Sequence, residues 1–417
     1  MNSLFKYPLF LGLTHIGQVF SIGWSEKISA CSVYDFNTVL LDRFKNSALT
    51  DEEPGLKKLF KKNKKKIYIC SSKNEIKKYQ NIFLTIDTPL TQNGKPDYNY
   101  IKKYLRESVS YFKKNANIII TSQVYCGFCD EIKKSIFKNR KDINIIYMAE
   151  TLVMGNALQR FLEPERLIFG SEKKIQIFKT LKKFKCPIFI LKHKQAEMIK
   201  MAINLFLVTS VSYANLLDLY CREYGFKFSS INKPIKLDKR IGLLSYISPS
   251  LGISGGHLER DLFSIIKTTK NSIVKKSFSK FQLLNKERLN LLFQLFDLLR
   301  KKNKFSKIIW VGPSYKKDSF SILNSPYFHF KKYLNKKGVT LFSYDSFFDL
   351  EKNKIKNVIK KINKSTFNKS LVIYNYLGER DLFLFIKLLK GNYIKSIDVN
   401  FSNNKLLKNK NNTSLLN

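Results

Sequence analysis

A glycine-rich segment, residues 251–262, carries the residue types best suited to chemistry. Glycine lets a backbone adopt positive φ and approach a ligand closely, and charged groups that directly follow such a loop can act on whatever it encloses. The largely apolar residues 262–266 come next and are typical of a helix. The alternative is a glycine-rich turn with a solvated Arg–Asp pair, and this segment by itself leaves both interpretations open. The residues of interest are Gly252, Gly255, Gly256, His257, Arg260 and Asp261.

A second candidate group lies on a long helix that the sequence predicts over residues 195–224. The spacing of Glu197, Lys200 and Asn204 places all three along one face of that helix. Lys200 is flanked by apolar residues, so it is partly desolvated if the helix is buried, and such a lysine is suited to proton transfer. The alternative is a surface lysine whose aliphatic stem lies along apolar neighbours while its ammonium reaches water.

Glu150 follows a predicted strand, residues 145–148. Ligands bind beyond the carboxyl ends of parallel strands, so a glutamate at this place is a candidate site residue. The alternative is a neighbour of a helix cap.

Cys126 and Cys129 have the spacing of a thiol–disulfide pair that opens a helix. The alternative is a strand-to-helix turn with two incidental cysteines, and the surrounding order of elements favours it because that order is not that of a small thioredoxin-like domain. No second CxxC or CxxH accompanies the pair, so we predict no metal site.

The start of the chain has the order of a dinucleotide-binding βαβ unit. An apolar run over residues 7–11 is followed by a glycine turn and a helical pattern that continues to Trp24. A second apolar run, residues 30–34, ends at Asp35. This order predicts a strand, a turn, a helix and a second strand that ends in an acid.

Each conspicuous residue of this unit has a predicted role. Gly12 would make the tight turn, and Gly17 would let the helix pack on the strand. Thr14 stands where a second glycine is usual. The helix N-terminus would face a pyrophosphate, and Asp35 would bind ribose hydroxyls, which favours NAD over NADP.

Strands and helices alternate along most of the chain, which predicts an α/β fold with parallel sheets. We predict two Rossmann-like doubly wound domains joined by a helical central domain. The predicted divisions are an NAD-binding domain over residues 1–190, a helical central domain over 191–303, a second Rossmann-like domain over 304–401 and a disordered tail over 402–417.

The composition limits the classes of partner. The 417 residues carry a formal net charge of +43, which favours anionic ligands. Because the lysines are spread along the whole chain, we predict no specific nucleic-acid site. Six scattered cysteines indicate a reduced, cytoplasmic protein, and we see no signal peptide. Polar residues interrupt the apolar stretch 203–220, so a buried helix explains it better than a membrane span.

The order of these segments resembles the UDP-glucose/GDP-mannose dehydrogenase family over nearly the whole chain. Partial forms of the family's motifs follow one another in the family's order. They are the cofactor turn at residues 12–17, blocks at 53–56, 88–97 and 122–127, a block at 149–157 continued by 164–170, the central helix with Lys200 and Asn204, the glycine loop from 249 to Asp261, and third-domain positions from Lys316 to Asp345.

Members of this family use NAD to oxidise C6 of a nucleotide sugar from alcohol through aldehyde to acid, and the resemblance implies roles here. Lys200 and Asn204 would handle the proton and the oxyanion at C6. Asp261 and a water would assist them, and Glu150 would assist a later hydrolysis. The resemblance also implies that the domain over residues 191–303 supports a homodimer through the long helix and that the domain over 304–401 binds the nucleotide sugar. More distantly, it implies a place in making surface polysaccharide precursors. The implied cofactor-binding residues are Gly12, Thr14, Ile16, Gly17, Asp35, Thr88, Pro89 and Gln123, and the implied substrate-binding residues are Leu152, Gly252, Gly255, Gly256 and Lys316.

One departure from the family concerns its nucleophile. The family places a cysteine just after the paired glycines, whereas here His257 and Leu258 follow Gly256 and the loop holds no cysteine. The aldehyde-to-acid step in the family's usual chemistry needs a thiohemiacetal. The product is therefore either the aldehyde, or the acid if a substitute nucleophile exists, and His257 is the first candidate. Leu323 replaces an arginine that the family usually carries, which weakens the substrate assignment.

Three functions remain open from the sequence. The first is an NAD-dependent nucleotide-sugar dehydrogenase, with the second oxidation in question. The second is a catalytically degenerate relative that still binds a nucleotide sugar or a partner protein. The third is a basic protein associated with nucleic acid, which strongly salt-dependent binding would support.

Overall fold

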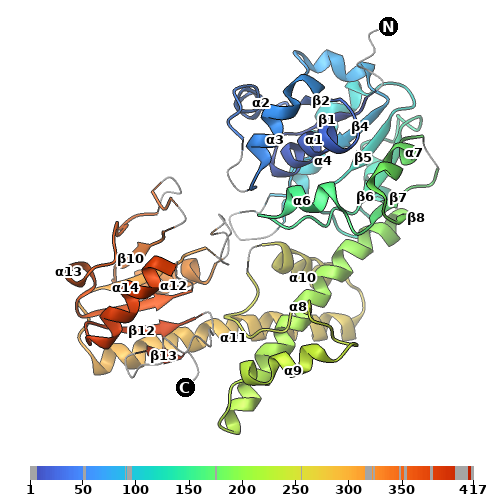
Figure 1. The fold of residues 1–417 in the computed structure, drawn as a ribbon. Helices are drawn as coiled ribbons and strands as arrows, with labels where there is room; N and C mark the ends of the chain where they lie inside the picture. Colours follow the sequence, from blue (N-terminus) through green and yellow to red (C-terminus); the bar gives the residue numbers. More distant parts are fainter. Residues whose placement is uncertain are drawn as a thin grey trace. The chain divides into compact units, whose positions relative to one another are not determined.

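The chain divides into two compact units, Met1–Ile203 and Asn204–Asn417, and each is described by itself (Figure 1). The division falls within one long helix, α8 (His193–Glu223). The structure is a computed structural model, and it describes residues 7–49, 53–89, 91, 96–173, 176–254, 256–314, 322, 325–346, 349–351, 355–375, 379–399 and 412–414.

The first unit is built on an eight-stranded sheet with the order β3-β2-β1-β4-β5-β6-β7-β8. All neighbouring strands are parallel except β6 and β7, which pair antiparallel. The prediction of a parallel doubly wound sheet is therefore confirmed for the part of the sheet formed by β1 to β6, whereas no strand was predicted at β3, β7 or β8. The strands are β1 (Leu9–Leu11), β2 (Cys31–Tyr34), β3 (Ile67–Ile69), β4 (Asn81–Leu84), β5 (Asn117–Ile120), β6 (Asn144–Met148), β7 (Leu167–Gly170) and β8 (Ile188–Leu191).

Both faces of this sheet are buried under helices. Successive side chains along each strand therefore point alternately into one of two apolar cores. Phe10 lies directly beside Phe83 on the neighbouring strand, and their rings stack at 5.1 Å in one core. Leu9 and Leu11 point into the other core. Helices α1, α2, α3, α6 and α7 supply apolar residues to the first core, and α4 and α5 supply them to the second. These helices are α1 (His15–Lys27), α2 (Thr38–Lys45), α3 (Leu56–Asn63), α4 (Tyr98–Ser108), α5 (Phe128–Ser135), α6 (Ala157–Leu162) and α7 (Ile177–Leu181).

Helix α8 is the long helix that the sequence predicts. It is also long and apolar enough by composition to cross a membrane, and it alone passes that test among the described residues. Half of its most apolar 18-residue window is buried inside the protein, and the core helix of a globular protein passes the same test.

The second unit combines helices with a five-stranded, fully parallel sheet of order β10-β9-β11-β12-β13. Its strand residues alternate as in the first unit. Ile308 and Trp310 face the core that α11 and α12 cover, and Ile309 and Val311 face the core that α14 covers. The elements are α9 (Asn232–Leu237), α10 (His257–Thr268), α11 (Ser272–Lys302), β9 (Ile308–Val311), α12 (Pro326–Lys336), β10 (Leu341–Tyr344), α13 (Lys364–Phe367), β11 (Ser370–Tyr374), α14 (Glu379–Lys390), β12 (Ile394–Asp398) and β13 (Asn412–Ser414).

Strand β13 corrects one prediction. The tail, residues 402–417, was expected to be disordered throughout, yet Asn412–Ser414 pair in parallel with residues 396–398 of β12. Without them β12 would be an edge strand with a row of unpaired backbone groups, and a short polar segment is enough to satisfy part of that row.

Candidate active site

The glycine turn after β1 has the geometry of a dinucleotide-binding turn. Gly12 adopts a φ of 110°, and a Cβ at this position would lie 2.4 Å from the Ile86 side chain. A Cβ on Gly17 would lie 1.9 Å from the carbonyl oxygen of Gly12. Both positions therefore require glycine: the first for its backbone conformation and the second because helix α1 packs directly against the turn.

Thr14, at the usual place of a second glycine, is accommodated without strain. Its φ of −65° is open to any residue, and it precedes the first residue of α1. Its hydroxyl donates to the carbonyl of Thr85 at 3.2 Å and accepts from the backbone N–H of Asp87 at 3.0 Å. The threonine therefore ties the start of α1 to the segment after β4. Ile16, also predicted at the cofactor, is buried in the first turn of α1.

Replacing Gly17 with alanine is expected to lower the free energy of unfolding by about 1–3 kcal/mol, the usual cost of overpacking a close-packed interior. NAD affinity should fall as well, because the turn must open to admit the methyl group. Urea unfolding and an NAD titration would measure both effects. Thr14→Ser keeps the bridging hydroxyl and serves as the control. Unchanged stability and affinity in the alanine variant would contradict the packing described here.

Asp35, at the end of β2, is 2% exposed and hydrogen-bonded within the protein. Its carboxylate accepts from the backbone N–H of Leu13 at 2.6 Å and of Asn37 at 2.8 Å. Burial raises the pKa of this carboxyl, and the two backbone hydrogen bonds offset only part of the effect. Asp35 thus orders the glycine turn, and its binding of ribose stays a prediction.

Three further predicted cofactor residues lie at the carboxyl ends of the adjacent strands β4 and β5. The Thr88 hydroxyl donates to the carbonyl oxygen of Gln123 at 2.6 Å, so the structure brings these two residues together. Both are buried, and Pro89 directly follows Thr88. The cofactor residues predicted from the sequence therefore gather at one edge of the sheet, where such sheets bind ligands.

Glu53 has a role that the sequence did not reveal. Its carboxylate lies 2.9 Å from Nε2 of His15, and it accepts from the backbone N–H groups of Gly155 and Ala157 at 2.7 and 2.9 Å. Burial opposes the charged form, but these hydrogen bonds outweigh it and hold the pKa of Glu53 below its usual value. One carboxylate thus joins the first residue of α1 to the start of α6.

Lys200 is a buried lysine, as the sequence predicts for a buried helix. It is 8% exposed, and its Nζ lies 3.5 Å from Oε2 of Glu150. The other carboxylate oxygen of Glu150 accepts from the backbone N–H of Leu152, which keeps the carboxylate next to the lysine. Three residues predicted separately, two catalytic and one substrate-binding, are therefore in contact.

Asn204 and Asp261 form a second buried pair. The amide Nδ2 of Asn204 donates to Oδ2 of Asp261 at 2.7 Å, and Asp261 is 1% exposed. The predicted start of the helix that carries Asp261 was wrong. We expected this helix from residue 262, but α10 begins at His257. Gly256, with a φ of 82°, precedes the helix. The polar residues after the glycines are thus helical, with His257 and Asp261 one turn apart.

The backbone of the glycine loop is held by side chains that sequence analysis largely missed. Asn285 accepts from the backbone N–H of Ile253 at 2.6 Å, and a Cβ on Gly252 would lie 1.9 Å from that same amide oxygen. Asn215 accepts from the N–H of Ser250 at 2.8 Å. The predicted substrate residues Gly252 and Gly256 both have positive φ, whereas Gly255 and Lys316 lie outside the described residues.

Arg288 supports the same loop from inside the unit. Its Nε donates to the carbonyl of Ser250 at 3.1 Å, and its guanidinium lies 3.6 Å from the buried Asp218. Burial lowers the pKa of Arg288 to about 10, and the charge of Asp218 counters this effect. The arginine therefore stays charged at neutral pH.

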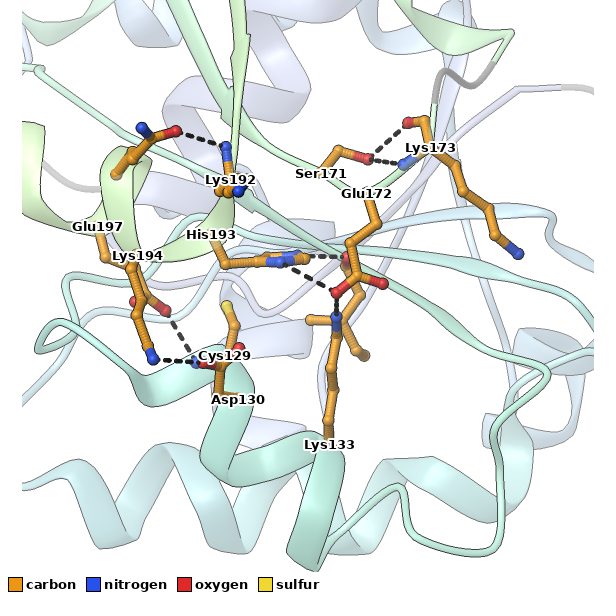
Figure 2. A network of polar contacts seen from close by, with 12 residues as sticks. Cys129, Asp130, Lys133, Ser171, Glu172, Lys173, Lys192, His193, Lys194 and Glu197 are labelled. Carbon is orange, nitrogen blue, oxygen red and sulfur yellow. Dashed lines mark hydrogen bonds and ion pairs between the residues drawn. The ribbon is translucent and has the colours of Figure 1, made fainter.

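The segment with Cys126 and Cys129 is a strand-to-helix turn clamped by α8. Figure 2 shows Glu197 of α8 beside Cys129. The buried carboxylate of Glu197 accepts from the backbone N–H groups of Gly127 at 2.6 Å and Cys129 at 2.8 Å. Both cysteines are free. Burial, reinforced by the charge of Glu197, raises the pKa of both thiols. A reactive thiolate needs the opposite surroundings, so the geometry favours the turn over redox chemistry.

Around this turn, an ion pair and a hydrogen bond join the first turn of α8 to the sheet domain (Figure 2). Lys194 pairs with Asp130 at 3.1 Å. Nε2 of His193 lies 2.8 Å from the carbonyl oxygen of Ile145. Glu197, predicted to share a face with Lys200 and Asn204, therefore anchors the helix that presents them. Within the described ranges, no group of three or more His, Cys, Asp or Glu residues could hold a metal ion.

A tight glycine turn opening a helix at the carboxyl edge of a doubly wound sheet defines the class: a dinucleotide-binding α/β protein. Residues 9–185 match the NAD binding domain of the UDP-glucose/GDP-mannose dehydrogenase family, and residues 194–286 match the central domain of the same family. The chain belongs to the UDP-glucose/GDP-mannose dehydrogenase family, and NAD is its cofactor.

Individual relatives agree with this assignment. The chain is 26% identical over 352 residues to the UDP-glucose 6-dehydrogenase of Rickettsia bellii, which covers 81% of this chain and 80% of that protein. It is 23% identical over 349 residues to the UDP-glucose 6-dehydrogenase TuaD of Bacillus subtilis, covering 80% and 75%. Both alignments extend well beyond the cofactor domain.

Solved structures share the fold. A UDP-glucose dehydrogenase from Pyrobaculum islandicum superposes with a TM-score of 0.85 at 19% identity, covering 98% of this chain and 97% of the other. The UDP-D-ManNAc dehydrogenase from Pyrococcus horikoshii gives a TM-score of 0.84 at 18% identity, covering 98% and 99%. These likenesses confirm the α/β fold class with Rossmann-like domains and a helical centre.

Proposed function

We propose that this chain oxidises C6 of a nucleotide sugar, a UDP- or GDP-hexose, with NAD as the hydride acceptor. The observation that carries the proposal is the pair of buried polar contacts on successive turns of α8. Lys200 contacts Glu150, and one turn later Asn204 contacts Asp261. Polar groups kept from water in this way are suited to stabilising charge that develops in a reaction.

The first oxidation converts the C6 alcohol to an aldehyde, with loss of the hydroxyl proton to a base and of the C6 hydride to NAD. Lys200 handles the proton at the C6 oxygen. Asn204 donates one N–H to Asp261 and has a second N–H with which to stabilise the oxyanion. Asp261 orients this amide, and Glu150 stands beside Lys200 to assist the proton transfer.

The second oxidation lacks its usual nucleophile, so we propose that the reaction stops at the aldehyde. The loop sequence holds no cysteine. Cys221 lies seventeen residues beyond Asn204 on α8, a rise of about 26 Å. Cys31 is fully buried, and burial raises its pKa far above the usual value of a thiol. None of these sulfur atoms suits a thiolate nucleophile at the loop.

A second function is a catalytically degenerate protein that binds a nucleotide sugar without oxidising it. The observation that favours it is again the loop, where His257 and Leu258 follow the glycines. Retained binding of a nucleotide sugar without NADH formation would identify this function.

The test is incubation of the purified protein and NAD with a panel of UDP- and GDP-sugars, with NADH followed by absorbance and products identified by mass spectrometry. An aldehyde with NADH near one equivalent supports the proposal. An acid product contradicts the arrest at the aldehyde. Binding without NADH, measured by calorimetry, supports the degenerate protein.

We also propose that the chain forms a homodimer through the exposed apolar stripe of α8. Large apolar side chains recur along one face of this helix, and such a stripe typically marks a protein interface. Light scattering should give twice the chain mass of 48.8 kDa. Leu216→Glu combined with Tyr220→Glu should give the single mass, whereas Lys239→Glu, an exposed charge change elsewhere, should not. A monomeric native protein would rule the proposal out. The stripe comprises Phe206, Tyr213, Leu216 and Tyr220, and the exposed Tyr224 directly follows the helix.

A further inference from the structure

The first turn of α10 contains a contact between an arginine and a histidine. His257 is the first residue of the helix and is exposed, whereas Arg260 is 4% exposed. Nη2 of Arg260 lies 2.7 Å from Nδ1 of His257, a hydrogen-bond distance. The two residues are three apart on the helix, so their side chains are neighbours.

This contact fixes the chemistry of the imidazole. A guanidinium has only N–H donors and no acceptor. Nδ1 of His257 must therefore present its lone pair to Arg260. A neutral imidazole has one nitrogen with a lone pair and one with a proton, so the proton lies on Nε2. The ring is neutral, because an imidazolium would carry protons on both nitrogens and could not accept from the arginine.

The position of the pair connects it with the candidate active site. Asp261 directly follows Arg260 and hydrogen-bonds to Asn204 on α8. His257 lies one turn before Asp261 on the same face of α10. His257 therefore lies on the same face of α10 as Asp261, which hydrogen-bonds to Asn204.

We infer that Arg260 is a positioning residue that fixes His257 as the neutral tautomer protonated on Nε2, so that His257 donates a hydrogen bond to the oxygen at C6 of the substrate. Its lone pair is directed at Arg260, so His257 acts neither as a nucleophile toward an aldehyde nor as a base for water. The hydrogen bond from His257 to the substrate rests on the proposed function, whereas the assignment of the tautomer does not.

The tautomer can be measured on the full chain without any substrate. The protein contains four histidines, and ¹⁵N labelling with comparison to His257→Asn assigns the signals of His257. We expect a protonated Nε2 and an unprotonated Nδ1 at neutral pH. A protonated Nδ1 would overturn the inference. In Arg260→Met the two tautomers should both become populated, whereas Arg260→Lys keeps a donor and should leave Nε2 protonated. An unchanged tautomer in a folded Arg260→Met would overturn the role of Arg260, and the measurement on the native protein decides the tautomer even if that variant does not fold.

The donor role is tested by activity with UDP-glucose and NAD. His257→Gln keeps an N–H donor and should retain most of the rate, whereas His257→Leu should lower kcat by about 10²-fold, the usual effect of removing one oxyanion donor. Equal rates in the two variants, or a sugar adduct on His257 in a peptide map, would overturn the donor role. Absence of NADH from the native protein with every nucleotide sugar would refute the proposed function and leave the tautomer to be decided by the NMR measurement.

Discussion

Replacing Lys200 with methionine is expected to lower NADH formation by about 10³-fold or more, within the range that a positioned proton-transfer group supplies. Methionine keeps the length and apolar stem of the side chain but removes its charge and its proton. The contact with Glu150 is lost with it, and that carboxylate is left half-buried without its partner. Initial rates of NADH formation with saturating nucleotide sugar would measure the effect.

Lys194 supplies the matched control, because it lies on the same helix and in an ion pair. Its side chain is 65% exposed and pairs with Asp130 at 3.1 Å. Lys194→Met should leave kcat nearly unchanged, since exposed ion pairs contribute little to stability. If Lys200→Met keeps the native rate while its melting temperature is unchanged, the role assigned to Lys200 is wrong.

Replacing His257 with cysteine is expected to raise the yield of NADH from about one to about two equivalents per sugar, because a thiolate provides the nucleophile that the second oxidation needs. The Sγ atom would add to the aldehyde carbon to form a thiohemiacetal. Transfer of its hydride to NAD gives a thioester, and water then releases the acid and the thiol. The helix N-terminus and Arg260 both favour the thiolate. Product mass and NADH yield at completion would be measured together.

A serine in place of His257 is the control for the cysteine variant. It has a similar size but no thiolate, so it should stop at the aldehyde. The prediction fails if the cysteine variant still yields only the aldehyde after its first oxidation has run to completion. A native protein that already makes the acid would show that the second oxidation does not need a thiol at this position.

The cofactor domain could be predicted from the sequence because its signals are local. Gly12, Thr14 and Gly17 lie within six residues of one another, and alternating apolar runs predict a buried parallel sheet. The fold class and cofactor followed from these patterns. For Lys200 the sequence left two possibilities, a partly desolvated lysine and a surface lysine, and the structure decided for the buried one.

Several contacts of the site join residues that are far apart in the sequence. Local sequence patterns cannot predict such contacts. Glu53 reaches the start of α6 about a hundred residues later, and Asn285 reaches the glycine loop 32 residues before it. The start of α10 was misplaced because the glycines suggested a longer loop. Strand β13 formed because the edge of β12 offered hydrogen bonds to a segment that has no apolar pattern of its own.

The sequence by itself determined the fold class, the cofactor and the residue types of the active site. The reason is that turn geometry and apolar periodicity depend on residues close together in the sequence. Only the tertiary structure decided which of those residues meet. It paired Lys200 with Glu150 and Asn204 with Asp261, and it set Arg260 against His257. The physical reason is that a side chain's chemistry depends on its partners and its burial, and both are properties of the packed chain.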